Sequence, residues 1–85
     1  MSAISVVTLY SRAGCHLCDE ARERLQALRR QGARFELREV DIESDERLHR
    51  RMLELIPVVE VDGEPVCELL LDEGAVLARI GTLSA

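Results

Sequence analysis

The sequence predicts an α/β fold with the element order β-α-β-α-β-β-α, in which a four-stranded mixed sheet carries helices on both faces. Three observations lead to this prediction: an apolar run near the start, apolar residues spaced three and four apart after it, and an Asp-Gly pair between two extended runs. A βαβ unit joined through a second helix to a hairpin builds such a sheet. With 85 residues, the chain is expected to form one domain over residues 1–85.

The first two elements follow from the spacing of apolar residues. Residues 4–10, ISVVTLY, are rich in β-branched side chains and almost continuously apolar, which is typical of a strand covered on both faces. We expect this strand to be buried and to run parallel to a neighbour. After the loop SRAG, a helix is predicted to end near Gly32. Its inner stripe is expected to be Leu17, Ala21, Leu25 and Leu28.

The middle of the chain predicts a second strand and a short helix. Residues 33–43 alternate and then change phase, which indicates a strand with a kink or bulge between Arg38 and Glu39. Ser44 is expected to cap the following helix. That helix must stop by Ile56, because the residue before a proline disfavours helix. Its inner stripe is expected to be Leu48, Met52 and Leu55.

The last part of the chain predicts a hairpin and a third helix. Residues 58–66 contain Asp62-Gly63 between two extended runs, the strongest short-range hairpin signal. We therefore expect the third and fourth strands to be antiparallel neighbours. Asp72 is expected to cap a last helix with Gly81 as its stop. The inward side chains of that helix are expected to be Val76, Leu77 and Ile80.

Composition excludes several classes of partner. Sixteen acidic and eleven basic residues give a formal net charge of −5, which would repel a nucleic-acid backbone. One Phe and one Tyr leave no aromatic platform for single-stranded nucleic acid. The chain starts without a basic leader, and no apolar run is long enough to span a bilayer. We expect a cytoplasmic monomer with neither a nucleic-acid nor a membrane partner.

The chemistry-bearing residues are cysteines. Cys15 and Cys18 lie between the first strand and the first helix, where a C-x-x-C pair indicates a redox motif. Two alternatives stay open: both are small core residues, or both are soft ligands of a Cu(I) carrier. Zinc would need two more ligands, and His16, His49 and Cys67 are not at finger spacing. Cys67 is interpreted as a core thiol, and His49 as a surface residue.

Two separated stretches together carry a family resemblance. LYSRAGCHLCDEA, followed later by IPVVEVDGEPV, resembles glutaredoxins, and more closely the small bacterial glutaredoxin-like proteins with a C-H-L-C motif. The resemblance covers nearly the whole chain. It implies a thioredoxin-like fold of the glutaredoxin type and a thiol-disulfide oxidoreductase, linked to glutathione or to thioredoxin. A thioredoxin-fold module that binds without catalysis is a further alternative.

The resemblance also implies roles for particular residues. Cys15 would be the exposed attacking thiol and Cys18 the buried resolving thiol. Pro57 would be a cis-proline opposite Cys15, and the backbone of Ile56 would pair with an extended substrate. Arg12 stands where glutaredoxins usually carry a Lys that meets a glutathione carboxylate. The implied substrate-binding set is Tyr10, Arg12, Ile56 and Pro57.

Elementary chemistry supports those thiol roles. A thiol at a helix N-terminus is favoured as thiolate by the helix dipole and by unpaired backbone N–H groups. His16 could favour the Cys15 thiolate further, whereas Asp19 and Glu20 in the same turn oppose it. The three-residue spacing brings Cys18 near the Cys15 sulfur, where it can resolve a mixed disulfide.

Two departures from the glutaredoxin pattern bear on the substrate. His16-Leu17 stands between the cysteines in place of the common Pro-Tyr, and Cys67-Glu68 stands in place of a Gly-Gly pair that lies against the γ-glutamyl end of glutathione. A side chain and a negative charge there would crowd and repel the carboxylate of that tripeptide. The expected partner is a disulfide-containing protein or a small thiol. Glutathione is a candidate electron donor, and no bound cofactor or metal is expected.

Overall fold

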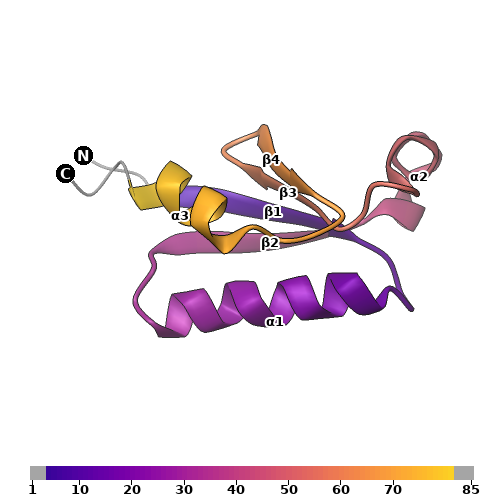
Figure 1. Cartoon of the computed structure of the whole chain (residues 1–85). Helices are drawn as coiled ribbons and strands as arrows, with labels where there is room; N and C mark the ends of the chain where they lie inside the picture. The colour runs from indigo at the N-terminus through magenta and orange to yellow at the C-terminus, as the bar shows by residue number, and fades with distance from the viewer. Residues whose placement is uncertain (1–3, 82–85) are drawn as a thin grey trace.

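The computed structural model describes residues 4–81, and its element order confirms the predicted one (Figure 1). The elements are β1 (Ser5–Ser11), α1 (His16–Arg30), β2 (Phe35–Asp41), the 3₁₀ helix η1 (Ile42–Ser44), α2 (Glu46–Met52), β3 (Val58–Val61), β4 (Glu64–Glu68) and α3 (Glu73–Gly81). Within this part of the chain, no helix is long and apolar enough to cross a membrane.

The sheet is mixed, with β1 at its centre. The strand order is β2-β1-β3-β4, and β1 runs parallel to β2 but antiparallel to β3. Strands β3 and β4 form the predicted antiparallel hairpin. Asp62 and Gly63 form its turn with φ of 52° and 87°, and this turn suits Asp-Gly because both central residues need a positive φ.

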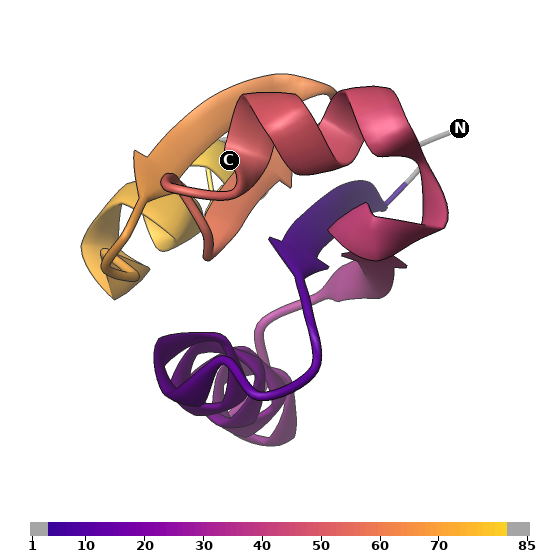
Figure 2. The same cartoon turned by 90° about the vertical axis from the view of Figure 1, so that its right-hand side faces the viewer.

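Two apolar clusters hold the layers together. The main core joins the sheet to α1 and α3, and its buried members are Val7, Leu9, Ala21, Leu25, Leu28, Phe35, Val59, Val61, Cys67, Val76 and Ile80. The small core joins α2 to one end of the sheet, and its buried members are Cys18, Ile42, Met52, Ile56 and Val58. Figure 2 shows α1 and α2 on opposite sides of the sheet, so the prediction of helices on both faces is confirmed.

The predicted bulge in the second strand is wrong. Strand β2 pairs with β1 in one unbroken register from Ser5 opposite Phe35 to Ser11 opposite Asp41. The apolar residues change phase because alternate residues of a strand point to opposite faces, and apolar groups lie on both faces of this sheet. An irregularity occurs in the hairpin instead, between Val59 and Glu60 of β3. It lies against the edge strand β4, where irregular pairing is common.

The start of the second helix also differs from the prediction. Asp45, not Ser44, is the N-cap, because its carboxylate accepts a hydrogen bond from the N–H of Arg47 at 2.7 Å. The Ser44 hydroxyl donates instead to the carbonyl of Asp41. Ile42 was expected within the second strand, but it lies in η1 and is fully buried in the small core. The helix ends at Met52, before Ile56 as predicted, but Leu55, which was expected in its inner stripe, lies beyond the helix.

Two leucines predicted to point inward are exposed. Leu17 and Leu77 are 42% and 38% exposed, whereas the other members of their helix stripes are buried. Leu17 lies in the first turn of α1, which extends beyond the main core. Asp72 caps α3 as predicted, since its carboxylate accepts from the N–H of Ala75. Gly81 is the last residue of α3, and residues 82–85 lie outside the part of the chain that the structure describes.

Candidate active site

A tight loop brings Cys15 to the start of α1. After β1 ends at Ser11, the chain turns through Gly14, whose φ of 81° is a conformation that other residues rarely adopt. The N–H of Cys15 donates to the carbonyl of Arg12 at 3.4 Å. Cys15 is then the N-cap of α1, and its sulfur accepts a hydrogen bond from the N–H of Cys18 at 3.1 Å. The first helical turn therefore points a backbone donor at the sulfur.

Cys15 and Cys18 are joined as a disulfide in this structure. Their Cα atoms lie 5.2 Å apart, within the usual span of a disulfide. Cys18 is fully buried in the small core, whereas Cys15 is half-buried at its edge. The pair is thus asymmetric, with one sulfur-bearing residue partly open to solvent and the other enclosed.

The segment before β3 packs against the same cluster. The Ile56–Pro57 peptide bond is cis, as the resemblance implied, and both residues are buried. Ile56 belongs to the small core together with Cys18. The N–H of Ile56 donates to the carbonyl of Met52 at 3.1 Å, so that donor is already used inside the protein. The pairing of the Ile56 backbone with a substrate stays a prediction. In that pairing, the Ile56 carbonyl is the backbone group left to bind the substrate.

Tyr10 and Arg12 flank Ser11, where β1 ends and the cysteine loop begins. The Tyr10 hydroxyl donates to Glu60 at 3.2 Å, and the ring packs on the small core. Burial first, and the adjacent Glu60 carboxylate second, raise the pKa of Tyr10. Arg12 is half-buried, with its guanidinium 4.0 Å from the carboxylate of Glu43. Neither side chain is bonded to Cys15 in the oxidised protein.

A polar network beside the loop was not predicted from the sequence. The Ser11 hydroxyl donates to Glu39 at 2.7 Å, and Arg22 donates to both Glu39 and Asp19. The Arg22 guanidinium, followed by the Ser11 hydroxyl, lowers the pKa of Glu39 against the opposing effect of burial. The carboxylates in turn raise the pKa of Arg22. This network ties the ends of β1 and β2 to the first turns of α1.

The network lines a small hollow next to the cysteine loop. The hollow measures about 220 Å³, and its lining residues are Ser11, Arg12, Ala13, Asp19, Arg22, Glu39 and Asp41. Only the spacing of Asp19 and Arg22 on one helix face could have indicated part of it. Glu39 gives no local signal, because its partners come from other elements.

The remaining candidate residues are His16, Cys67 and His49. His16 is exposed and lies 3.0 Å from the Glu20 carboxylate, so its contact is with that residue. Cys67 is buried as predicted, where burial raises the pKa of its thiol. His49 was expected at the surface but is half-buried. Within residues 4–81, no group of three or more His, Cys, Asp or Glu side chains is placed to hold a metal ion.

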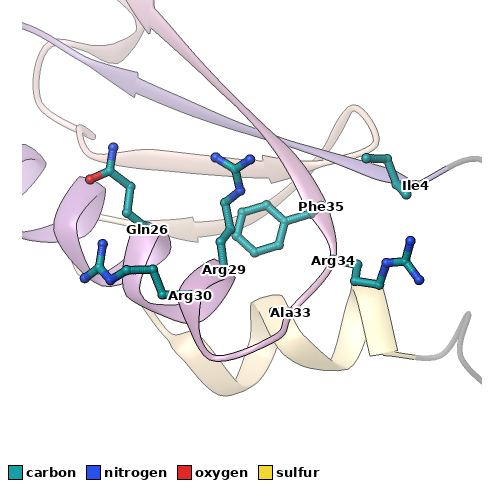
Figure 3. A pocket seen from close by; sticks show the side chains of 7 residues that line it. All are labelled: Ile4, Gln26, Arg29, Arg30, Ala33, Arg34 and Phe35. Carbon is teal, nitrogen blue, oxygen red and sulfur yellow. The ribbon is translucent and has the colours of Figure 1, made fainter.

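A larger hollow lies at the far end of α1 and is not part of this site. It measures about 560 Å³ and is lined by Ile4, Gln26, Arg29, Arg30, Ala33, Arg34 and Phe35 (Figure 3). The Arg29 guanidinium lies 5.9 Å from the centre of the Phe35 ring, a cation–π contact. Arg30 and Arg34 point away from each other (Figure 3). The arginine heads therefore do not converge on one ligand.

The four-stranded mixed sheet, the cis-proline before β3 and the C-x-x-C pair at the start of α1 define a thioredoxin-fold protein. More particularly, the model of the family described as Glutaredoxin-like domain (DUF836) matches residues 6–81. The chain belongs to this family, which confirms the resemblance seen in its sequence.

Solved structures of similar proteins agree with this assignment. Protein Ne2328 from Nitrosomonas europaea is 28% identical with a TM-score of 0.80, covering 94% of this chain and 95% of that one. A structural genomics target protein from X. campestris is 29% identical with a TM-score of 0.68, covering 89% and 96%. Glutaredoxin from Brucella melitensis is 25% identical with a TM-score of 0.55, covering 98% and 88%. The likeness extends over almost the whole chain in each case.

Proposed function

We propose that this protein is a thiol-disulfide oxidoreductase that works through Cys15 and Cys18. The observation that carries the proposal is the position of the Cys15 sulfur: it caps α1, accepts the N–H of Cys18 at 3.1 Å, and is already paired with that residue. When the bond is reduced, the same N–H and the positive end of the helix dipole favour the thiolate of Cys15. The thiolate is the form that exchanges disulfides.

The reaction balances with the two cysteines alone as electron carriers. The Cys15 thiolate attacks a substrate disulfide, so the substrate S–S bond breaks, a Cys15–substrate bond forms and one substrate thiolate leaves. The Cys18 thiolate then attacks the Cys15 sulfur and releases the second substrate thiolate. Two electrons pass to the substrate, and the two protons from the cysteines end on its thiols. A thiol donor of the glutathione or thioredoxin class reduces the pair again.

The remaining predicted residues take supporting roles in this proposal. Pro57 and the Ile56 carbonyl form the platform beside the disulfide, while Tyr10 and Arg12 contribute to the edges of the substrate site. The positions of these residues support the assigned roles. Tyr10 and Ile56 pack in the cluster that contains Cys18, and Arg12 begins the loop that ends at Cys15. The proposal places the reaction in the cytoplasm, where donor thiols are kept reduced.

The first test is disulfide reduction by the wild type and by single cysteine variants. We expect Cys15→Ser to abolish the activity, because the thiol that remains in the first turn of α1, Cys18, is fully buried. The matched control is Cys67→Ala, which removes the buried thiol of β4 and should keep the activity. The assay follows reduction of a small disulfide with dithiothreitol as the donor.

Two further readouts separate this proposal from its rivals. Cys18→Ser should accumulate a mixed disulfide on Cys15, which intact-mass measurement detects. A pair that never closes to a disulfide in a dithiothreitol redox titration would contradict the proposal. Stoichiometric copper on a protein without reductase activity would instead favour a metal carrier.

A further inference from the structure

A single arginine joins the first turns of α1 to the end of β2. The Arg22 guanidinium donates to Glu39 from Nε at 2.7 Å and to Asp19 from Nη1 at 2.9 Å, and its Nη2 also binds Glu39. The buried Ser11 donates its hydroxyl to the same Glu39 carboxylate at 2.7 Å. A two-bond contact between guanidinium and carboxylate fixes the orientation of both groups. Arg22 is therefore held between two carboxylates that come from different elements.

Asp19 lies one helical turn after Cys15. The N–H of Asp19 donates to the carbonyl of Cys15 at 3.1 Å, which is the spacing of neighbouring turns. Residues four apart share a helix face, and helical side chains lean toward the N-terminus of their helix. An unrestrained carboxylate at this position would therefore lean toward the Cys15 sulfur. Its negative charge would disfavour the thiolate there.

The structure directs the Asp19 carboxylate elsewhere. Arg22 lies further along α1 than Asp19, on the side away from Cys15, and binds the carboxylate from that direction. Asp19 and Arg22 also line the hollow of about 220 Å³ beside the cysteine loop, whose lining residues include neither Cys15 nor Cys18. The Asp19 carboxylate is therefore drawn along the helix toward Arg22, and the guanidinium offsets part of the negative charge.

The other charged groups near the start of α1 form a separate set of contacts. In the described part of the chain, Glu39 and Asp19 are the charged groups that act on Arg22. The surrounding groups are His16 with Glu20, Arg12 with Glu43, Asp41 with the N–H of Glu43, Tyr10 with Glu60 and Arg51, and the exposed Glu54 and Glu68. Because these groups stay the same when Arg22 is replaced, they act on Cys15 as a constant background.

We propose that Arg22 is a positioning residue for the disulfide exchange: it holds the Asp19 carboxylate away from the Cys15 sulfur and thereby keeps more of Cys15 as thiolate. Glu39 and Ser11 fix Arg22 in turn, so an edge strand supports the reactivity of the first helix. The inference rests on the proposed function, since the thiolate of Cys15 is the form that attacks a substrate disulfide.

The test measures the alkylation rate of Cys15 over a range of pH in the reduced full-length protein. Peptide mass assigns the label to Cys15, and the rate follows the thiolate fraction because the thiolate is the reacting form. Arg22→Gln releases Asp19 and removes the compensating charge. We expect the rate at pH values below the midpoint of the profile to fall about threefold. The midpoint itself should move to higher pH.

Two further variants separate this role from a general loss of charge. Arg24→Gln removes the same charge from the same helix, but Arg24 lies on the opposite face of α1 from Cys15 and pairs with Glu73 of α3. Its alkylation profile should follow the wild type. Arg22→Lys keeps the charge but cannot form two parallel bonds to Glu39. Its profile should lie between those of the wild type and Arg22→Gln.

Asp19→Asn in two backgrounds tests the positioning itself. With Arg22 present, Asp19 is already held away, so Asp19→Asn should change the alkylation rate by less than about twofold. In Arg22→Gln, the same change should raise the rate about threefold and return the profile to that of the wild type. Two independent charges would give equal factors in both backgrounds. A merely structural loss would not be reversed, because the double variant still lacks the contact between residues 19 and 22.

The outcomes separate the two proposals. An Arg22→Gln profile that matches the wild type, or equal factors for Asp19→Asn in the two backgrounds, would overturn this inference. The alkylation assay needs no disulfide substrate, so reduction of hydroxyethyl disulfide by the wild type tests the proposed function on its own. A wild type that shows the predicted coupling but reduces no disulfide would uphold the positioning of Asp19 and overturn the proposed function.

Discussion

At the scale of single residues, the site depends on the groups that surround the sulfurs of Cys15 and Cys18 and the carboxylate of Glu39. Cys15 takes the N-cap position that Ser, Thr, Asp or Asn usually occupies, and a sulfur therefore receives the first-turn N–H. Glu39 fixes the other end of the loop, because its carboxylate accepts hydrogen bonds from both Ser11 and Arg22. The loop between β1 and α1 is thus held at both of its ends.

Glu39 should make the stability of the protein depend on acid. Its folded-state pKa lies below the unfolded value, chiefly because Arg22 binds the carboxylate. The contribution is therefore complete above the unfolded pKa and is lost as pH falls through the folded pKa. We expect Glu39→Gln to lower the free energy of unfolding at neutral pH by about 1 kcal/mol. The variant should then lose less stability than the wild type between about pH 6 and about pH 3.

Urea unfolding at several pH values measures this effect. Glu36→Gln is the control, because Glu36 lies on the same strand and pairs only with exposed Arg38. The control should follow the wild-type acid profile. If Glu39→Gln is as sensitive to acid as the wild type, Glu39 is not the group whose protonation weakens the fold.

At the scale of elements, short segments place the site and depend on their caps. Helix α2 has only seven residues and would be marginal alone, so its position comes from packing Met52 into the small core. Asp45 satisfies the N–H of Arg47 at its start. The turn after α2 leads to the cis bond between Ile56 and Pro57, and Ile56 packs in the same small core as Met52.

Removing this cap should therefore weaken the element. Asp45→Ala is expected to lower the free energy of unfolding by about 1 kcal/mol, because the N–H of Arg47 loses its acceptor. Asp45→Asn keeps an acceptor of the same length and should stay close to the wild type. Chemical denaturation of both variants at neutral pH makes the comparison. Equal losses in the two variants would mean that charge, not capping, matters at this position.

At the scale of the whole molecule, the protein has two apolar cores: one packs most of the fold, and the other lies beside the cysteine pair. The main core fills the space between the sheet and the long helices, whereas the small core encloses Cys18 at one end. This separation lets the cysteine pair lie at an edge, partly open to solvent, without exposing the interior. Proteins of this size have a net stability of only about 5–15 kcal/mol, so the loss of a few kcal/mol from the main core is a large part of the total.

A pair of leucine variants tests this division. Leu25 is fully buried in the main core, so Leu25→Ala should cost about 2–5 kcal/mol through lost burial and a cavity. Leu77 was predicted to be buried but is exposed, and Leu77→Ala should change stability by less than about 0.5 kcal/mol. Thermal or urea unfolding measures both. A large loss for Leu77→Ala would restore the inward placement that the helical spacing predicted.

Helical spacing, turn residues and the position of the cysteine motif were readable from the sequence because each acts over a few neighbouring residues. The same reasoning failed where apolar residues lie on both faces of the sheet, and where two neighbouring residues are equally good N-caps. It placed a bulge between Arg38 and Glu39, where the apolar residues only change from one face of the sheet to the other. It chose Ser44 as the N-cap of α2, although the neighbouring Asp45 is an equally good cap by residue type. Leu17 fits the helical stripe but is 42% exposed, whereas the other members of that stripe are buried.

The sequence by itself determined the order of the elements, the Asp-Gly hairpin and the cysteine pair at the start of α1, since spacing and backbone preference are local properties. Only the tertiary structure decided the partners of Glu39 and the exposure of Leu17 and Leu77. Those features join segments that are distant along the chain, as with Ser11 and Glu39. Such contacts exist only once the sheet has brought the segments together.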